Sequence, residues 1–180
     1  MKYVLSAITV AVLGLAAPAL AEEQMVAPTG LYGTFGYAGA NQSGVDLGAI
    51  QGRIGYRFNN WLGAEGEVSG GVKDDRKSIA PGVDAKFKLD HQEALYGVGL
   101  VPLSPQFDLI GRVGYGHSRV SAKADGISVA DAADSWNFGA GAQYYFDGKN
   151  GVRADYTREE FQRTDGGHAD VWSVAYSRRF

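Results

Sequence analysis

The chain has 180 residues, a formal net charge of −3 and no cysteine. A slightly acidic chain without a basic stripe argues against nucleic acid as a partner, and the lack of cysteine excludes disulfides and a lipid anchor on an N-terminal cysteine. Glycine is abundant, with 26 residues, but it follows no G-X-Y period and 45% of the chain is hydrophobic, which argues against both collagen and disorder.

The first 21 residues have the features of a secretory signal peptide. Lys2 precedes a mainly apolar stretch from Val4 to Ala17, and Ala19-Leu20-Ala21 forms an A-x-A site. A transmembrane anchor, the alternative, would need about 20 apolar residues and a stop-transfer flank. We therefore expect cleavage after Ala21, export, and a single mature domain that comprises residues 22–180.

Residues 22–180 contain eight segments in which apolar and polar side chains alternate. Successive side chains of a strand point to opposite faces, so each segment predicts a strand with one apolar and one polar face. The segments are 31–38, 47–58, 62–69, 92–102, 107–118, 136–146, 152–157 and 171–180. In 92–102 the even-numbered residues from Ala94 to Leu100 are expected on the apolar face, although Leu95 and Val101 interrupt the polar one. Helical spacing is not convincing anywhere in 22–180, so the domain is predicted to be all-β.

Eight alternating strands fit either a soluble sandwich or a transmembrane barrel, and the connections help to separate the two. At one end the expected connections are short, at 59–61, 103–106 and 147–151. At the other end they are a modest one at 39–44 and longer ones at 73–86, 119–134 and 162–169. Outer-membrane barrels alternate tight periplasmic turns with longer extracellular loops in this way, whereas a sandwich has no reason to do so.

Aromatic residues gather toward both ends of the predicted strands. Amphipathic rings lie at headgroup level in membrane barrels, so two belts are expected there. One belt comprises Phe58, Trp61, Phe107, Phe146 and Phe180, and the other comprises Tyr37, Tyr115, Trp136 and Trp172. Because lipid offers no partner for backbone polar groups, the sheet is predicted to close into an eight-stranded antiparallel up-and-down transmembrane β-barrel. A soluble secreted sandwich is the alternative fold.

Three sequence runs resemble the small eight-stranded outer-membrane barrels, namely OmpA-type transmembrane domains, OmpX/Ail proteins and opacity surface proteins. The runs are IQGRIGYRFNNWLGAEGEVSG, LIGRVGYGHSRV and FGAGAQYYFDGKNGVRADYTREEF, and the closing VAYSRRF adds to them. The resemblance implies a monomer in the outer membrane of a Gram-negative cell, in contact with lipid and lipopolysaccharide. It also implies a structural or surface-exposed protein whose loops contact a host or cell-surface ligand. The peptidoglycan-binding domain of full-length OmpA has no counterpart here, so a tether to the cell wall is not expected.

The last strand resembles the assembly signal of this family, a terminal Phe preceded by apolar residues at alternate positions. Carried over to this chain, the signal falls on Trp172, Val174, Tyr176 and Phe180, and Arg178 departs from the usual apolar choice. The resemblance implies that periplasmic chaperones deliver the chain to the barrel-assembly machinery, which reads this strand.

Charged residues on the polar faces are expected inside the barrel. If Phe58 pairs with Leu62 across the turn, Arg53 lies opposite Glu67. An eight-stranded barrel is just wide enough inside for side chains to fill. We therefore expect a lumen charge network of Arg53, Arg112 and Arg153 with Glu65, Glu67 and Asp155. Glycines on the same inward face should leave room for Arg112, namely Gly97, Gly99, Gly114 and Gly116.

Two alternative functions remain open at this point. OmpA-type barrels suggest that exchange of ion-pair partners can gate a narrow, low-conductance pore, although a plugged lumen is the preferred interpretation. Some barrels of this size are lipid A-modifying enzymes that use His with Ser and a carboxylate. Here His117 and Ser118 are adjacent, so they should point to opposite faces. His168, with Asp165 and Asp170, is more typical of a solvated loop than of a metal site. We predict no enzymatic activity, no cofactor and no metal.

Overall fold

The computed structural model describes residues 28–180, apart from 43–44, 74, 81–82, 125–126 and 163–166. The predicted signal peptide and its cleavage site lie outside these residues. Across the described ranges, no helix is long and apolar enough to cross a membrane. The strands are β1 (Gly30–Gln42), β2 (Val45–Arg57), β3 (Leu62–Lys73), β4 (Asp75–Ala80), β5 (Val83–Ser104), β6 (Phe107–Ala124), β7 (Ile127–Tyr145), β8 (Asn150–Phe161) and β9 (His168–Arg179).

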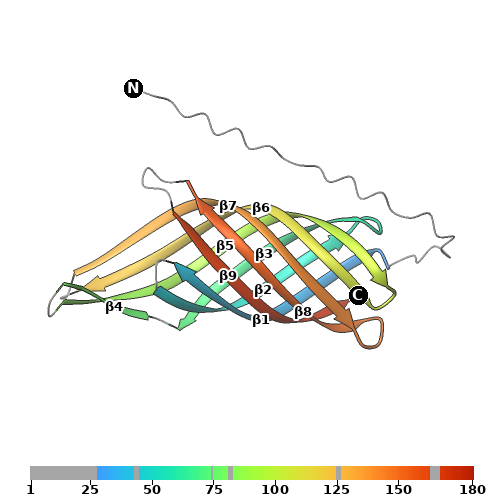
Figure 1. Ribbon diagram of the computed structural model, residues 1–180, viewed down its shortest axis with the longest axis horizontal. Helices are drawn as coiled ribbons and strands as arrows, with labels where there is room; N and C mark the ends of the chain where they lie inside the picture. Colours follow the sequence, from blue (N-terminus) through green and yellow to red (C-terminus); the bar gives the residue numbers. More distant parts are fainter. Residues whose placement is uncertain (1–27, 43–44, 74, 81–82, 125–126, 163–166) are drawn as a thin grey trace, which may run out of the picture.

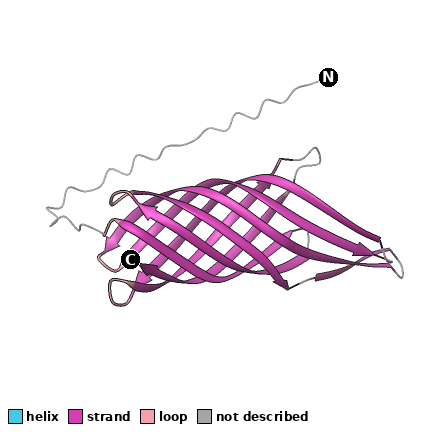
Figure 2. Cartoon of the chain, turned by 180° about the vertical axis from the view of Figure 1, so that it is seen from behind, coloured by secondary structure: helices cyan, strands magenta, loops and turns pink. Residues whose placement is uncertain are grey.

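The strands form one sheet that closes on itself. Their order is β3-β2-β1-β9-β8-β7-β6-β5-β4, and an additional pairing of β3 with β5 completes the ring. The first and last strands are hydrogen-bonded neighbours, with Tyr37 opposite Val174. The paired strands are antiparallel, and Figures 1 and 2 show them tilted around the long axis from opposite sides. The predicted eight-stranded up-and-down barrel is confirmed, with β4 as an extra short strand.

Two of the predicted long loops are β-hairpins instead. Residues 73–86 were expected as a loop, but β4 pairs there with the start of β5, so that Asp75 lies opposite Phe87. In 119–134, the ladder between β6 and β7 continues until Ala124 lies opposite Ile127. These hairpins extend the barrel at the end where β4 lies (Figure 1). Backbone hydrogen bonds hold such ladders in water without an apolar face, so alternation of side chains could not reveal them.

The faces of most strands follow the predicted alternation. In β8, for example, buried and exposed residues alternate along almost the whole strand, with Arg153 and Asp155 inward and Val152 and Tyr156 outward. The exposed positions carry large apolar side chains and the buried positions carry many polar ones. This distribution is inverted relative to a soluble protein, and it indicates an outer surface in contact with hydrocarbon.

The face assignment in β5 was wrong. Ala94, Tyr96, Val98 and Leu100 point inward and form a buried apolar cluster with Ile110 of β6. Leu95 points outward and is 73% exposed, and Glu93 and Val101 share its face. Both faces of β5 carry apolar residues here, so the sequence pattern does not show which face points inward. Pairing decides the orientation, because Leu95 lies opposite outward-facing Tyr115 of β6.

The two aromatic belts are present on the outer surface. At the end with short turns, the rings of Tyr144 and Phe146 lie 6.2 Å apart, and at the other end those of Tyr115 and Trp136 lie 5.4 Å apart. From Phe107 to Tyr115, β6 spans about 26 Å at about 3.3 Å per residue, or about 20 Å along the axis for a tilt of about 40°. This height is close to the apolar band of about 25 Å in outer-membrane barrels.

The short turns are fixed by side chains that accept backbone hydrogen bonds. Asn59 Oδ1 accepts from the N–H groups of Trp61 (2.8 Å) and Leu62 (2.9 Å) between β2 and β3. Between β7 and β8, Asp147 accepts from the side chain and the backbone of Asn150 and from the backbone of Lys149, which lowers the pKa of its carboxyl to about 2. The predicted short connections at this end are thereby confirmed.

Spin labels on single cysteines test the orientation of β5, because the native chain has no cysteine. A nitroxide on Leu95→Cys should collide frequently with oxygen dissolved in the bilayer, since Leu95 faces lipid. The label on Val174→Cys, an outward residue of β9, serves as reference, and a label on Val98→Cys should be immobile and poorly accessible. Electron paramagnetic resonance measures both the mobility of the label and its accessibility to oxygen. High oxygen accessibility at residue 98 and low accessibility at residue 95 would contradict the orientation given above.

Candidate functional site in the barrel lumen

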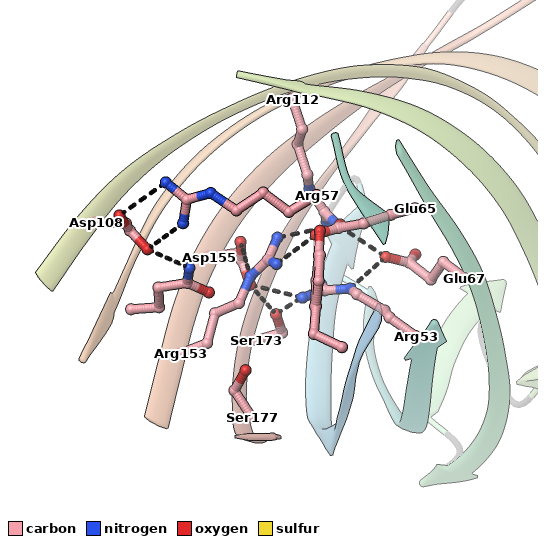
Figure 3. Close-up of polar contacts among 12 residues, drawn as sticks. Arg53, Arg57, Glu65, Glu67, Asp108, Arg112, Arg153, Asp155, Ser173 and Ser177 are labelled. Carbon is pink, nitrogen blue, oxygen red and sulfur yellow. Dashed lines mark hydrogen bonds and ion pairs between the residues drawn. The ribbon is translucent and has the colours of Figure 1, made fainter. Parts of the chain in front are cut away.

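The six charged residues predicted for the lumen lie together inside the barrel (Figure 3). β2 supplies Arg53, β3 supplies Glu65 and Glu67, β6 supplies Arg112, and β8 supplies Arg153 and Asp155. All six are buried, with exposed fractions between 1% and 6%. Each occupies an inward position of its strand, so the alternation of side chains alone brings them into one enclosed space.

Ion pairs connect the six residues into one network. Arg53 pairs through Nε with Glu67 (2.8 Å), which lies opposite it in the β2–β3 ladder as predicted, and through Nη1 with Asp155 (2.7 Å). Arg112 Nη1 lies 2.9 Å from the same Oε2 atom of Glu67. Arg153 pairs with Glu65 (2.5 Å) and with Asp155 (2.9 Å). Three guanidinium groups thus face three carboxylates, and the network is neutral overall.

Neutral side chains complete the network, and the sequence did not identify them. The hydroxyl of Tyr32 donates to Glu65 (2.6 Å), Arg112 Nη2 donates to the Thr157 hydroxyl (2.6 Å), and Arg53 Nη2 donates to that of Ser173 (3.1 Å). The Arg112 guanidinium also lies 4.3 Å from the centre of the Tyr96 ring. Alternation places these residues inside, but which ones meet across the lumen depends on the closed geometry of the barrel.

The prediction that four glycines make room for Arg112 was wrong. Gly97 and Gly99 belong to the outward face of β5, whereas Gly114 and Gly116 face inward. A Cβ at Gly114 would lie 2.5 Å from the Tyr96 ring, so this glycine admits the tyrosine and not the arginine. The space beside Arg112 comes from Gly139 on β7, where a Cβ would lie 3.0 Å from Arg112 Cγ.

A second charged cluster closes the lumen at the end with short turns. Asp108, which is 1% exposed, pairs with Arg57 (2.9 Å) and Arg179 (3.1 Å) and accepts a hydrogen bond from Gln143 (2.8 Å). Arg179 also stacks at 3.5 Å from the centre of the Tyr145 ring. Arg57, Gln143, Tyr145 and Arg179 help to line a cavity of ≈ 20 Å³, enough for a single water. Arg57 and Arg179 occupy inward positions of β2 and β9, but the alternation of side chains does not reveal that they converge on Asp108.

The four residues predicted as an assembly signal lie on the outer face of β9. Trp172, Val174, Tyr176 and Phe180 are all exposed, and Arg178 shares their face with its guanidinium 5.9 Å from the centre of the Phe180 ring. β9 pairs with β1 on one side and β8 on the other, so the strand is also the seam at which the barrel closes.

The residues considered for catalysis or metal binding do not converge. His117 points outward, where Nδ1 lies 2.7 Å from Asp134, while Ser118 is buried in the lumen. Asp170 pairs with Arg158 (2.9 Å) rather than contributing to an acidic cluster, and Asp165 lies outside the described residues. Within the part of the chain that the structure describes, no group of three or more His, Cys, Asp and Glu could hold a metal ion.

The closed ring of tilted strands, its apolar outer band and its charged interior define a transmembrane β-barrel of the outer-membrane type. Residues 7–180 match the model of the outer membrane protein beta-barrel domain, and the chain belongs to this family. The predicted resemblance to small eight-stranded outer-membrane barrels is thereby confirmed, and membership places the protein in the envelope of a Gram-negative cell, in its outer membrane. A search of curated proteins finds no match.

Solved structures of outer-membrane barrels share the fold. The attachment invasion locus protein Ail of Yersinia pestis, solved in complex with the heparin analogue sucrose octasulfate, is 21% identical with a TM-score of 0.61, and the match covers 84% of this chain and 99% of Ail. The N-terminal barrel of Pseudomonas aeruginosa OprF (14%, TM-score 0.58) is matched over 83% of this chain and 99% of its own. Neisserial surface protein A (14% identity, TM-score 0.58) is matched over 86% of this chain and 99% of its own length. At these identities the likeness concerns the fold alone.

Removal of Arg112 tests the energetic role of the network. Arg112→Ala should lower the free energy of unfolding by about 3–5 kcal/mol, because it takes one cation from buried Glu67 and leaves space beside Gly139. Arg119→Ala, on an exposed position of the same strand, should change it by no more than about 0.5 kcal/mol. Denaturant unfolding of both variants in lipid vesicles gives the comparison. Equal losses in the two variants would show that the ion pairs contribute nothing specific.

Proposed function

We propose that this protein is a structural, surface-exposed barrel of the outer membrane that contributes to envelope integrity and whose lumen is plugged by the charge network. The observation that carries the proposal is the chain of ion pairs from Arg53 through Glu67 to Arg112, with Arg153 bridging Glu65 and Asp155. These side chains cross an interior that eight strands leave barely wide enough for them. A second barrier lies at Asp108, with its two arginines.

We infer that the end with long hairpins faces the cell exterior and makes contacts at the surface. Small outer-membrane barrels place short turns in the periplasm and longer connections outside. The hairpins of β4 with β5 and of β6 with β7 extend the barrel at that end. Ail, which shares the fold, was solved with a heparin analogue, and we propose that this chain likewise uses its exterior end to contact a host or cell-surface ligand.

Features of the first and last segments support a proposal for the biogenesis of the protein. We propose that the segment before residue 22 is a signal peptide cleaved after Ala21, and that periplasmic chaperones then carry the mature domain. The barrel-assembly machinery would read Trp172, Val174, Tyr176 and Phe180. These side chains lie in a row on the outer face of the closing strand, which supports a role in recognition before β9 pairs with β1. The folded product is proposed to be a monomer without enzymatic activity, in contact with lipid and lipopolysaccharide.

A narrow pore is the second candidate, and one contact favours it. Arg112 Nη1 lies 2.9 Å from Glu67 and 3.8 Å from Glu65, so a small movement would exchange its partner. Exchange of this kind would open a path along the lumen without unfolding the barrel. The plug remains the main proposal, since each of the three arginines also has a second carboxylate or hydroxyl partner.

Planar-bilayer recording distinguishes the plug from the pore. Purified wild-type barrel, shown to be folded by its electrophoretic mobility before and after boiling, should give no unitary conductance steps. Arg112→Ala should produce brief steps, because the variant lacks a side chain that crosses the lumen, and Arg119→Ala should behave like wild type. Regular steps from the wild-type protein would refute the plug and support the pore.

A further inference from the structure

One buried carboxylate in the lumen takes no part in the ion pairs described above. Glu159 points inward from β8 and is 4% exposed, on the long-hairpin side of Arg153 and Asp155. Its Oε1 atom accepts a hydrogen bond of 2.5 Å from Nε2 of Gln92 on β5. Among the described residues, no ion pair within 4 Å joins it to an arginine, lysine or histidine. A buried carboxylate without a counter-charge is strongly unfavourable.

The charges around Glu159 do not neutralise it. Arg112 and Glu67 both act on it electrostatically, but they are paired with each other at 2.9 Å and their fields largely cancel. The excess positive charge of the lumen, from Arg57 and Arg179 around Asp108, lies at the opposite end, beyond the network. Among the side chains that the structure describes on the long-hairpin side of the lumen, Glu159 therefore contributes one uncompensated negative charge.

Two buried hydroxyl groups lie in the same layer of the lumen. Ser69 of β3 and Ser118 of β6 are the direct strand partners of Gln92 on its two sides. Both serines are more than nine-tenths buried, and neither Oγ atom has a hydrogen-bond partner among the described residues. Hydroxyl and carboxylate oxygens are the ligands that hard cations prefer. An unneutralised carboxylate and two unused oxygens thus share one layer.

We propose that this layer, formed by Ser69, Gln92, Ser118 and Glu159, binds one monovalent cation of the Na⁺ or K⁺ class. A single carboxylate matches a single positive charge, whereas protein sites for Ca²⁺ commonly draw on several carboxylates. Such a cation would neutralise the Glu159 carboxylate, just as the arginines of the network neutralise the carboxylates in the middle of the lumen. The site goes beyond the plug, because it assigns a ligand to a part of the lumen that the ion-pair network leaves charged.

Thermal unfolding of the detergent-solubilised barrel tests the site. At pH 8 and constant ionic strength, replacement of N-methylglucamine chloride by NaCl or KCl should raise the Tm of the wild type in a saturable manner, by about 2–4 °C. Glu159→Gln should abolish this dependence. Ser118→Ala, which keeps the charge, should raise the half-saturating cation concentration about fivefold. Glu160→Gln, the same change at the neighbouring exposed residue, should respond like wild type.

Crystals of the wild-type protein grown with Rb⁺ give a readout that does not depend on any variant. An anomalous peak should lie within the layer, close to the Glu159 carboxylate. A Tm that is the same in all three salts, together with no anomalous peak in the lumen, would overturn the proposal and would mean that the carboxyl carries a proton. An equal cation response in Glu159→Gln and wild type would also overturn it.

Discussion

Backbone hydrogen bonding in a medium without water determines the rest of this structure. In hydrocarbon, every unpaired N–H or C=O group costs several kcal/mol, so a sheet can cross the membrane only if it has no free edge. The pairing of β1 with β9 removes the last edge and joins the two ends of the domain. Closure then divides every strand into a face toward lipid and a face toward a narrow interior. The alternating sequence supplies apolar side chains for the first face and polar ones for the second.

The enclosed interior imposes a second constraint, which is local neutrality. Arginine suits this space because its planar group donates to two carboxylates at once, as Arg53 does to Glu67 and Asp155. Buried ion pairs add little to stability compared with apolar packing, but removal of one partner is expensive. The main effect of the network is therefore to disfavour incorrect registers of the strands. A strand shifted by one residue would bring its charges to the lipid and leave their partners unpaired.

The sequence could predict the orientation of a strand only where its two faces differ in polarity. In β2 and β3, apolar and charged residues alternate cleanly, and the turn set the register, so Arg53 opposite Glu67 could be predicted. In β5 both faces are apolar, and the orientation of Leu95 follows from the pairing with neighbouring strands and not from the sequence pattern. Contacts across the lumen, such as Tyr32 with Glu65, depend on strand tilt and stagger, which local patterns do not encode.

The orientation of the two faces can be measured directly through the native tryptophans. Of the three tryptophans of the chain, Trp136 and Trp172 lie on the outer face of β7 and β9 and Trp61 lies in the turn between β2 and β3, and all are about half exposed. In vesicles of brominated phospholipid, the folded barrel should lose most of its tryptophan fluorescence, because the rings contact the lipid. The same fluorescence in brominated and ordinary vesicles, with the protein shown to be folded and membrane-bound, would place the tryptophans in a protein core and contradict the barrel described above.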